Sequence, residues 1–168
     1  GLFLVLEGGE GVGKSTNMAF IQEYLQQQNI SFVHSREPGG TDIGEKIRAL
    51  MLDTKHHNMS DLCELLLVFA ARAQHLQEKI VPTLQQGKWL VCDRFTDATY
   101  AYQSGGRGVP AEKVALLENF VQGEFRPDLT LLLDAPIEVG MSRAEKRGAL
   151  DRFEEEEMSF FNRVRDNY

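Results

Sequence analysis

The chain has 168 residues, of which 42% are hydrophobic and 26% are charged, a composition typical of one soluble globular domain with a sizeable core. Its formal net charge of −7 argues against a nucleic-acid partner, because nucleic-acid-binding domains are usually basic. The apolar runs are too short to span a bilayer, and the first residues are typical of a strand rather than a signal peptide. We therefore expect no membrane partner and a cytoplasmic protein.

The first predicted element is a strand over residues 2–6, which leads directly into a glycine-rich loop and then a helix. The loop has the spacing G-x-x-x-x-G-K-S, and between a strand and a helix start this pattern is typical of phosphate binding. Its glycines let successive backbone N–H groups converge on one anion, with the positive end of a helix dipole behind them. A glycine-rich hairpin or a chance match is the alternative, which the Lys-Ser pair and the preceding strand disfavour. The residues expected to hold a nucleoside triphosphate are Gly8, Gly9, Glu10, Gly11, Val12, Gly13, Lys14, Ser15 and Thr16.

Two further strands are predicted to end in charged residues. The strand over 31–35 runs into Arg36-Glu37-Pro38-Gly39-Gly40, where proline and two glycines enforce a loop. Thr41 can cap the helix that follows, and Arg48 lies on one face of that helix. The strand over 88–92 ends in Asp93-Arg94-Phe95.

A long helix is expected to begin at Ser60, with an apolar stripe over 62–76 that is either core or a face pairing two subunits. Pro82 should end or kink this helix. The two cysteines, Cys63 and Cys92, lie in apolar stretches, which favours reduced, packed thiols. The remaining expected elements are a polar segment at 96–103, a flexible run at 104–108, a helix at 110–123, a strand at 129–133, a helix from 136 and a helical segment at 153–168.

Strands that alternate with helices predict an α/β fold of the P-loop NTPase type, in which two helical layers enclose a parallel sheet. Ligands of such sheets bind at the carboxyl ends of the strands. The strand ends supply Glu7, Arg36-Glu37, Asp93-Arg94 and Asp134. Because no repeat or linker interrupts the sequence, we expect a single domain over residues 1–168.

These residue types fit phosphoryl transfer, which requires that negative charge be neutralised around the transferred group. Lys14 is a cation for the β- and γ-phosphates, and the Ser15 hydroxyl with Asp93 can hold Mg²⁺ directly or through water. Arg94 can clamp an acceptor phosphate, although a surface ion pair with Asp93 is the alternative. The segment Arg143–Arg147 is either a solvated helix face or a mobile lid over the phosphates.

Along nearly its whole length the chain resembles the thymidylate kinase (dTMP kinase) family. The motifs that carry the resemblance are Glu7-Gly8, Gly13-Lys14-Ser15-Thr16, the REPGGT stretch 36–41, the stretch 69–75, Asp93-Arg94-Phe95, Ala101-Tyr102-Gln103, the stretch 125–129, Arg147-Gly148 and Leu150-Asp151-Arg152. Glu10 in the loop, with arginines in a lid at about 143–152, is similar to the bacterial type. The resemblance implies the reaction ATP + dTMP → ADP + dTDP with Mg²⁺, a parallel sheet of order 2-3-1-4-5, and a homodimer.

The resemblance also implies roles at the reacting phosphates. Arg94 and Arg48 would hold the dTMP phosphate, with Arg36 nearby, and Glu37 would lie beside the phosphate and the metal. Arg143 and Arg147 would reach the transferring phosphoryl group from the lid.

For the nucleoside, the resemblance implies that Phe69 stacks on thymine while Arg72 and Gln103 read its polar edge. In many members the stacking aromatic lies four residues before the arginine, the place of Val68 here. Tyr102 would crowd the 2′ position of the sugar, and Glu10 would approach its 3′-hydroxyl. Family members usually continue beyond the position of Tyr168 into a final strand and helix that help to seat adenine, so we expect this chain to lack them.

Three other functions stay open at this point. A deoxynucleoside kinase would have a neutral acceptor, for which Arg36, Arg48 and Arg94 would be surplus. A nucleotide-dependent switch for GTP would need a guanine-reading N-K-x-D element, which the sequence lacks. A purely structural P-loop subunit is the third alternative.

Overall fold

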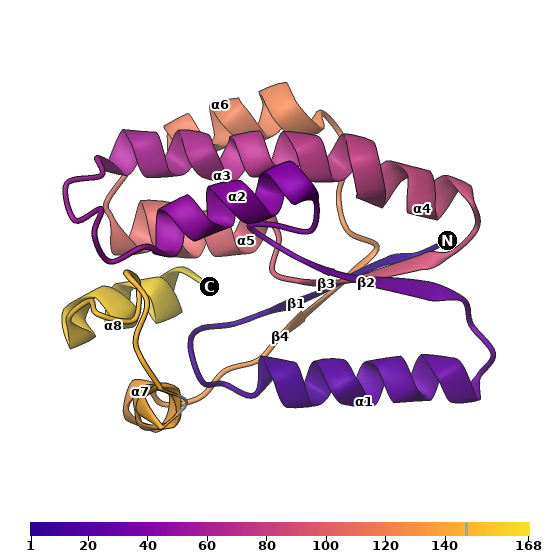
Figure 1. Ribbon diagram of the computed structural model, residues 1–168, viewed down its shortest axis with the longest axis horizontal. Helices are drawn as coiled ribbons and strands as arrows, with labels where there is room; N and C mark the ends of the chain where they lie inside the picture. The colour runs from indigo at the N-terminus through magenta and orange to yellow at the C-terminus, as the bar shows by residue number, and fades with distance from the viewer. Residues whose placement is uncertain (147) are drawn as a thin grey trace.

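The computed structural model describes residues 1–146 and 148–168 and shows a parallel sheet between layers of helices (Figure 1). The strands of this described part are β1 (Phe3–Glu7), β2 (Phe32–Arg36), β3 (Trp89–Asp93) and β4 (Leu129–Leu132). Their order is β2-β3-β1-β4, and each neighbouring pair is parallel. The expected α/β fold and the 2-3-1-4 part of the strand order are confirmed, and residues 1–146 and 148–168 contain no fifth strand.

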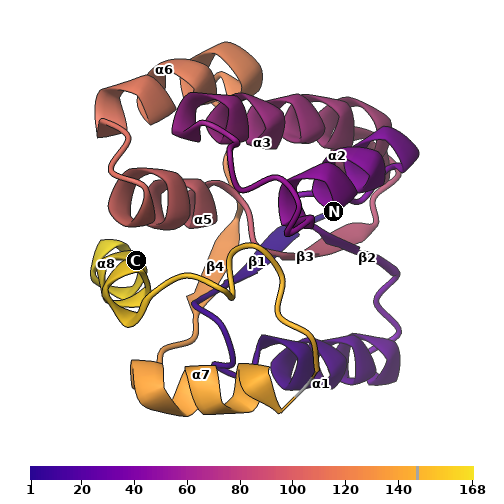
Figure 2. The same ribbon diagram turned by 60° about the vertical axis from the view of Figure 1, so that its left-hand side comes forward.

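Helices lie on both sides of the sheet (Figures 1 and 2). One side carries α1 (Lys14–Gln27) and, nearer the carboxyl ends of the strands, α7 (Ile137–Glu145). The opposite side carries α2 (Asp42–Leu52), α3 (Asp61–His75), α4 (Val81–Gln85), α5 (Thr96–Thr99) and α6 (Ala111–Gln122). Two π-helical segments, η1 and η2, and the last helix, α8, complete the described part; their bounds are Leu76–Ile80, Tyr100–Gly106 and Met158–Asn167. No helix of the described residues is long and apolar enough to cross a membrane.

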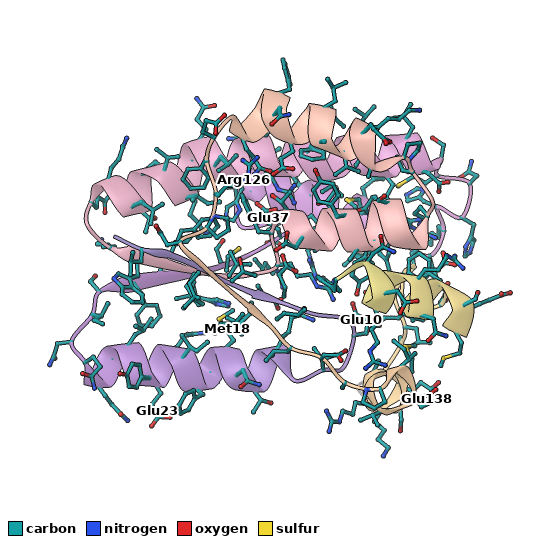
Figure 3. The ribbon with its side chains drawn as sticks, turned by 180° about the vertical axis from the view of Figure 1, so that it is seen from behind. Glu10, Met18, Glu23, Glu37, Arg126 and Glu138 are labelled. Atoms are coloured by element: carbon teal, nitrogen blue, oxygen red, sulfur yellow. The ribbon has the colours of Figure 1, made fainter. Side chains whose placement is uncertain are left out.

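The alternation of side chains along the central strand β1 divides the core into two halves. Phe3 and Val5 point to one face of the sheet and pack with Leu76, Ile80, Leu90, Cys92 and Phe95. The opposite face of β1 and β3 packs against α1, and its buried residues are Leu4, Leu6, Met18, Leu25 and Val91. In Figure 3, Met18 lies between α1 and the sheet while Glu23 points outward from the same helix. Because both faces of β1 are buried, the loop that follows it starts from a rigid base.

Several helix boundaries follow the predicted signals. The Thr41 hydroxyl accepts the Gly44 N–H at 3.0 Å at the start of α2, and Ser60 caps α3 in the same way. Helix α6 begins after Pro110 and ends before Gly123, whose φ of 55° suits a residue without a side chain. By contrast, Pro82 does not end the helical run from Ser60: α3 passes into η1 at Leu76, and Pro82 lies in the first turn of α4, where the missing N–H costs no hydrogen bond within that helix.

Two sequence expectations require correction. The segment over 96–108 is helical through α5 and η2 up to Gly106, rather than a polar stretch followed by a flexible run. An added Cβ at Gly106 would lie 2.5 Å from the Phe160 ring, so this glycine permits close packing against α8. Of the two cysteines, Cys92 is buried as expected but Cys63 is exposed.

Candidate active site

A cavity of about 880 Å³ lies at the carboxyl ends of the strands, where the sequence predicted a ligand site. The phosphate-binding loop forms one side of it, and residues of β2, α2, α3, β3 and η2 form the other. The predicted site residues that line it are Glu10, Gly11, Val12, Gly13, Lys14, Ser15, Thr16, Arg36, Glu37, Arg48, Arg72, Asp93, Arg94, Tyr102, Gln103 and Arg143. One cavity therefore brings together the loop and the charged strand ends.

The loop has a backbone that requires its glycines. Gly8, Gly11 and Gly13 have φ values of 136°, 67° and 99°, a region that side chains disfavour. At Gly11 there is also no room, because an added Cβ would lie 2.0 Å from the carbonyl oxygen of Gly140 in α7. Helix α7 thus packs directly on the loop.

Lys14 is folded back onto the same loop. Its Nζ donates to the carbonyl oxygens of Gly8 at 2.9 Å and Gly9 at 2.8 Å, and the residue is buried. Burial, followed by the nearby guanidinium of Arg94, lowers the pKa of Lys14 to about 8 in spite of neighbouring carboxylates. Both acceptors are neutral carbonyls, and an anionic phosphate oxygen is a stronger partner for an ammonium group.

Arg94 lies across the cavity in a cluster with Glu10 and Tyr102. Its Nη2 donates to Glu10 Oε1 at 2.6 Å and to the Tyr102 hydroxyl at 2.9 Å, and that hydroxyl donates to Glu10 Oε1 at 2.9 Å. The guanidinium also stacks over the Tyr102 ring at 4.7 Å. Burial acts to raise the pKa of Glu10, but the charges of Arg94 and Lys14 outweigh it and lower this pKa to about 2. The cluster therefore holds an anionic carboxylate against a fixed guanidinium.

Arg72 is 1% exposed, yet it forms part of the cavity wall. Its Nε pairs with Glu37 Oε2 at 2.7 Å, and its Nη2 donates to the Phe95 carbonyl at 3.1 Å and to Thr99 Oγ1 at 2.9 Å. Its Nη1 is buried and has no hydrogen-bond partner among the described residues. Because an unpaired buried donor is costly, Nη1 is suited to a polar ligand atom in the cavity.

Glu37 has different neighbours from those the sequence suggested. Besides Arg72, its carboxylate bonds His75 Nδ1 at 2.9 Å, and His75 Nε2 lies 2.6 Å from Ser35 Oγ. Both carboxylate oxygens are thus engaged by protein groups, and Glu37 orients Arg72 at the wall of the cavity that Asp93 and Arg94 also line. His75 had been given no role, since nothing in the sequence indicates that it meets a residue 38 positions away.

Phe69 does not reach the cavity, which corrects the expectation that it stacks on thymine. It is 2% exposed and packs with Leu65, Val109 and Val114 between α3 and α6. Successive residues of a helix point in directions about 100° apart, so Val68 faces the cavity where Phe69 does not. The Phe69 ring instead supports Arg72, whose guanidinium carbon lies 4.9 Å from the ring centre.

The remaining predicted acceptor residues reach the cavity with protein partners. Arg48 donates to the Pro38 carbonyl at 3.0 Å. Arg36 is half exposed and forms a two-pronged pair with Glu45, with its Nη2 at 2.7 Å from Oε2. The hydrogen bonds from Arg36, opposed by burial and assisted by the Gly40 N–H, lower the pKa of Glu45 to about 2. Glu45 was not predicted as a site residue.

Gln103 is held by a buried acid that sequence reasoning missed. Its Nε2 donates to Glu64 Oε1 at 2.9 Å, and Glu64 also pairs with Arg107 and Arg152. Arg152 is the last residue of the expected lid and is itself buried. Glu64 thereby ties Gln103 to the end of the lid segment.

Asp93 and Ser15 provide two oxygen ligands of the kind that a metal ion needs on the donor side. Asp93 Oδ1 is buried and has no hydrogen-bond partner within the described part of the chain, and Ser15 lies at the start of α1 on the same cavity. A carboxylate and a hydroxyl are ligands that suit Mg²⁺. The described residues contain no cluster of three or more His, Cys, Asp or Glu side chains that could hold a metal without further ligands.

Of the two lid arginines, Arg143 lies on α7 and its Nη1 donates to the Gly11 carbonyl at 3.2 Å. Arg147, which was also expected to act there, lies outside the described residues.

Comparisons with known proteins agree on one family. The family model described as thymidylate kinase matches residues 6–168. The chain is 59% identical over 168 residues to a thymidylate kinase of Ectopseudomonas mendocina, covering 100% of this chain and 80% of that one. A thymidylate kinase of Pseudomonas syringae pv. tomato is 57% identical with the same coverage. The crystal structure of thymidylate kinase from Ehrlichia chaffeensis is 34% identical, with a TM-score of 0.79, and the alignment covers 99% of this chain and 81% of that one.

Proposed function

The chain belongs to the thymidylate kinase family, and from this premise we propose which parts of its cavity carry out the reaction. The reaction is the phosphorylation of dTMP to dTDP, a step of dTTP biosynthesis, by in-line transfer of a phosphoryl group. The chain is thus a kinase, and the alternatives of a switch and a structural subunit are set aside. The finer assignments are that ATP is the donor, that Mg²⁺ is the cofactor, and that the protein acts in the cytoplasm without nucleic-acid or membrane partners.

On the donor side, the loop amides and Lys14 hold the triphosphate. Lys14 exchanges the Gly8 and Gly9 carbonyls for phosphate oxygens, which are charged and therefore better acceptors. Ser15 and Asp93 hold Mg²⁺, and the unpaired Oδ1 of Asp93 supports this assignment. When bound, the metal neutralises phosphate charge; the chain's own groups orient the donor.

On the acceptor side, Arg94, Arg48 and Arg36 bind the phosphate of dTMP. The single observation that carries the proposal is that these arginines line the same cavity as the phosphate-binding loop. Three guanidiniums suit a phosphate dianion, whereas a neutral nucleoside has no charged group for them to bind. This argument favours dTMP over thymidine as the acceptor.

The nucleoside is read by buried polar groups. Arg72 Nη1 and Gln103 donate to the polar edge of thymine, Tyr102 lies beside the 2′ position of the sugar, and Glu10 approaches the 3′-hydroxyl. An unpaired buried donor discriminates strongly, because a base without a matching acceptor leaves it unsatisfied. Arg143 and Arg147 from the lid stabilise the transferring phosphoryl group.

A homodimer is part of this proposal. Large apolar side chains are exposed on α3 and α6, which lie next to each other (Figure 1). They are Leu62, Leu66, Leu116 and Phe120. An apolar patch of this kind marks a protein–protein contact in many soluble proteins.

A coupled assay that follows ADP release tests the proposal. With ATP and Mg²⁺ we expect turnover with dTMP and none with thymidine, and equal rates with both would contradict the acceptor assignment. Lys14→Ala and Arg94→Ala should each reduce turnover by at least about a hundredfold, the scale of one lost electrostatic contact at a reacting group.

A further inference from the structure

The acceptor side of the cavity depends on one turn, Asp93-Arg94-Phe95, at the end of β3. Arg94 has a φ of 69°, and this left-handed conformation costs about 1 kcal/mol or more for a residue with a side chain. Such a conformation persists only where surrounding groups hold it. The partners of the neighbouring peptide groups therefore show what keeps Arg94 in place.

Glu7, the last residue of β1, is the side chain that holds this turn. Its Oε1 accepts the Phe95 N–H at 2.7 Å and the Ala98 N–H at 3.3 Å, and its Oε2 accepts the Tyr168 hydroxyl at 3.0 Å. The N–H of Arg94 itself donates to a main-chain carbonyl of β1 at 2.8 Å. The strained residue is thus tied to β1 on both sides, once through the main chain and once through Glu7.

The main chain of Phe95 also leads to the second acceptor residue. The carbonyl of Phe95 accepts Arg72 Nη2 at 3.1 Å, while the Phe95 N–H is bound by Glu7. Glu7 is 1% exposed and does not belong to the cavity wall, so it cannot touch a ligand from this position. It is a buried acid to which the reaction described above assigns no task.

We propose that Glu7 is a positioning residue of the acceptor site, whose carboxyl group fixes the Arg94-Phe95 turn and thereby sets Arg94 and Arg72 in one geometry. The inference rests on the proposed function, since it presupposes that these two arginines bind the phosphate and the base of dTMP. A misplacement of about 1 Å at such a site can reduce the rate about a hundredfold. A substitution of Glu7 should therefore change KM for dTMP much more than KM for ATP.

The positioning role of Glu7 requires that its side-chain oxygen lie within hydrogen-bond distance of the Phe95 N–H, and it does not require a charge on the carboxyl group. Burial raises the pKa of Glu7 to about 7, against the hydrogen bond from Phe95 and the charge of Arg94. Either protonation state retains a carbonyl oxygen that accepts the Phe95 N–H. A neutral side chain of equal length should consequently replace Glu7, and a charged shorter one should not.

Three substitutions separate reach from charge. Glu7→Gln keeps a carbonyl oxygen at the same distance, Glu7→Asp keeps the charge but withdraws the oxygen by about 1.5 Å, and Glu7→Ala removes the group. We expect the Asp and Ala variants to raise KM for dTMP about 10- to 100-fold, and the Gln variant to raise it less than about threefold. KM for ATP should change less than about threefold in all of them, since Lys14 and Gly11 are held by contacts within the loop and with α7 that do not involve Glu7.

Leu4→Ala is the matched control. Leu4 is buried on the same strand but on the opposite face, so its loss lowers stability without moving the turn, and KM for dTMP should stay at the wild-type value. If the Glu7→Ala variant does not fold, the KM values of Glu7→Gln and Glu7→Asp for dTMP decide whether the inference holds. An unchanged KM for dTMP in the Asp variant, or a Gln variant as impaired as the Asp variant, overturns the inference.

The test also distinguishes this inference from the proposed function. Arg94→Lys and Arg72→Lys are measured beside the Glu7 variants. If both leave KM for dTMP unchanged, the proposed acceptor site is wrong and the inference fails with it. If both raise KM and the Glu7 variants do not, the acceptor site stands and the positioning role of Glu7 is wrong.

Discussion

Arg72 performs two tasks with one guanidinium. Two of its nitrogens hold Glu37 and the Phe95 carbonyl, and the third is left unpaired at the cavity wall. The planar, fixed fork of arginine makes this possible, because each nitrogen has its own direction.

We predict that Arg72→Lys raises KM for dTMP about a hundredfold, since an ammonium group cannot pair with Glu37 and serve the base at once. KM for ATP should change little. Steady-state kinetics with dTMP varied at saturating ATP measures the effect. Lys46→Ala, an exposed charge on α2, is the control and should match the wild type. A wild-type KM in the Arg72 variant would remove its role in reading the base.

Glu10 makes the stability of the protein depend on pH. The lowered pKa, about 2 against an ordinary 4.5, means that the folded state binds its proton less readily than the unfolded chain. Its contribution is therefore present above pH 4.5 and is lost as the pH falls towards 2. The largest value, on the order of 3 kcal/mol, follows from the size of the pKa difference.

The prediction is that Glu10→Gln lowers the free energy of unfolding at pH 6 and that its difference from the wild type shrinks between pH 4.5 and pH 3. Urea unfolding at several pH values measures this. If the difference in the free energy of unfolding between the two proteins stays constant over the whole pH range, the ion pair between Glu10 and Arg94 does not cause the loss of stability in acid.

At the residue scale, the sequence indicated the types and spacing of the cavity residues but not the side chains that hold them in position. Glu64, His75 and Glu45 hold Gln103, Glu37 and Arg36 through contacts that join distant parts of the chain or cross a loop. No local sequence pattern predicts these hydrogen-bonded pairs. The misassignment of Phe69 has a geometric cause, because a shift of one residue on α3 turns a side chain from the core into the cavity.

At the element scale, prediction succeeded where a local signal determines the structure. The short apolar strands, the Thr41 and Ser60 caps and the Pro110–Gly123 helix all depend on neighbouring residues. The prediction for residues 96–106, a polar segment followed by a flexible run, was wrong. This polar and glycine-rich sequence has low helix propensity, and its helical form depends on packing. Here η2 lies against α8, which is 52 or more residues later in the chain.

Gly106 tests this explanation. We predict that Gly106→Ala lowers the free energy of unfolding by about 1–3 kcal/mol, because the new methyl group would overlap the Phe160 ring and separate η2 from α8. An intrinsic preference alone would predict the opposite, since alanine favours helices more than glycine does. Urea denaturation measures the change, and Ser104→Ala on the same segment should stay within about 0.5 kcal/mol of the wild type. A stabilised Gly106 variant would show that the contact with α8 is loose.

At the scale of the whole molecule, the strand order explains why distant charges share one cavity. β1 and β3 are neighbours at the centre of the sheet, and the carboxyl end of each faces the same side as that of β2. The sequence alone predicted this convergence from the alternation of strands and helices, because parallel strands share one carboxyl edge. It could not predict which outer helix faces remain open, since both core and interface residues are apolar.

The exposed patch on α3 and α6 leads to a prediction about assembly. Phe120 is 86% exposed and lies on α6, and Phe20, on α1 at the other side of the sheet, is 66% exposed. If α3 and α6 pair two subunits, Phe120→Glu places a charge in an apolar interface and should weaken the dimer at least about a hundredfold, because a buried unpaired charge costs several kcal/mol. Light scattering after gel filtration over a range of concentrations should then give a dimer for the wild type and for Phe20→Glu, but a monomer for Phe120→Glu. A Phe120→Glu protein that stays dimeric, or a Phe20→Glu protein that dissociates, would place the interface elsewhere.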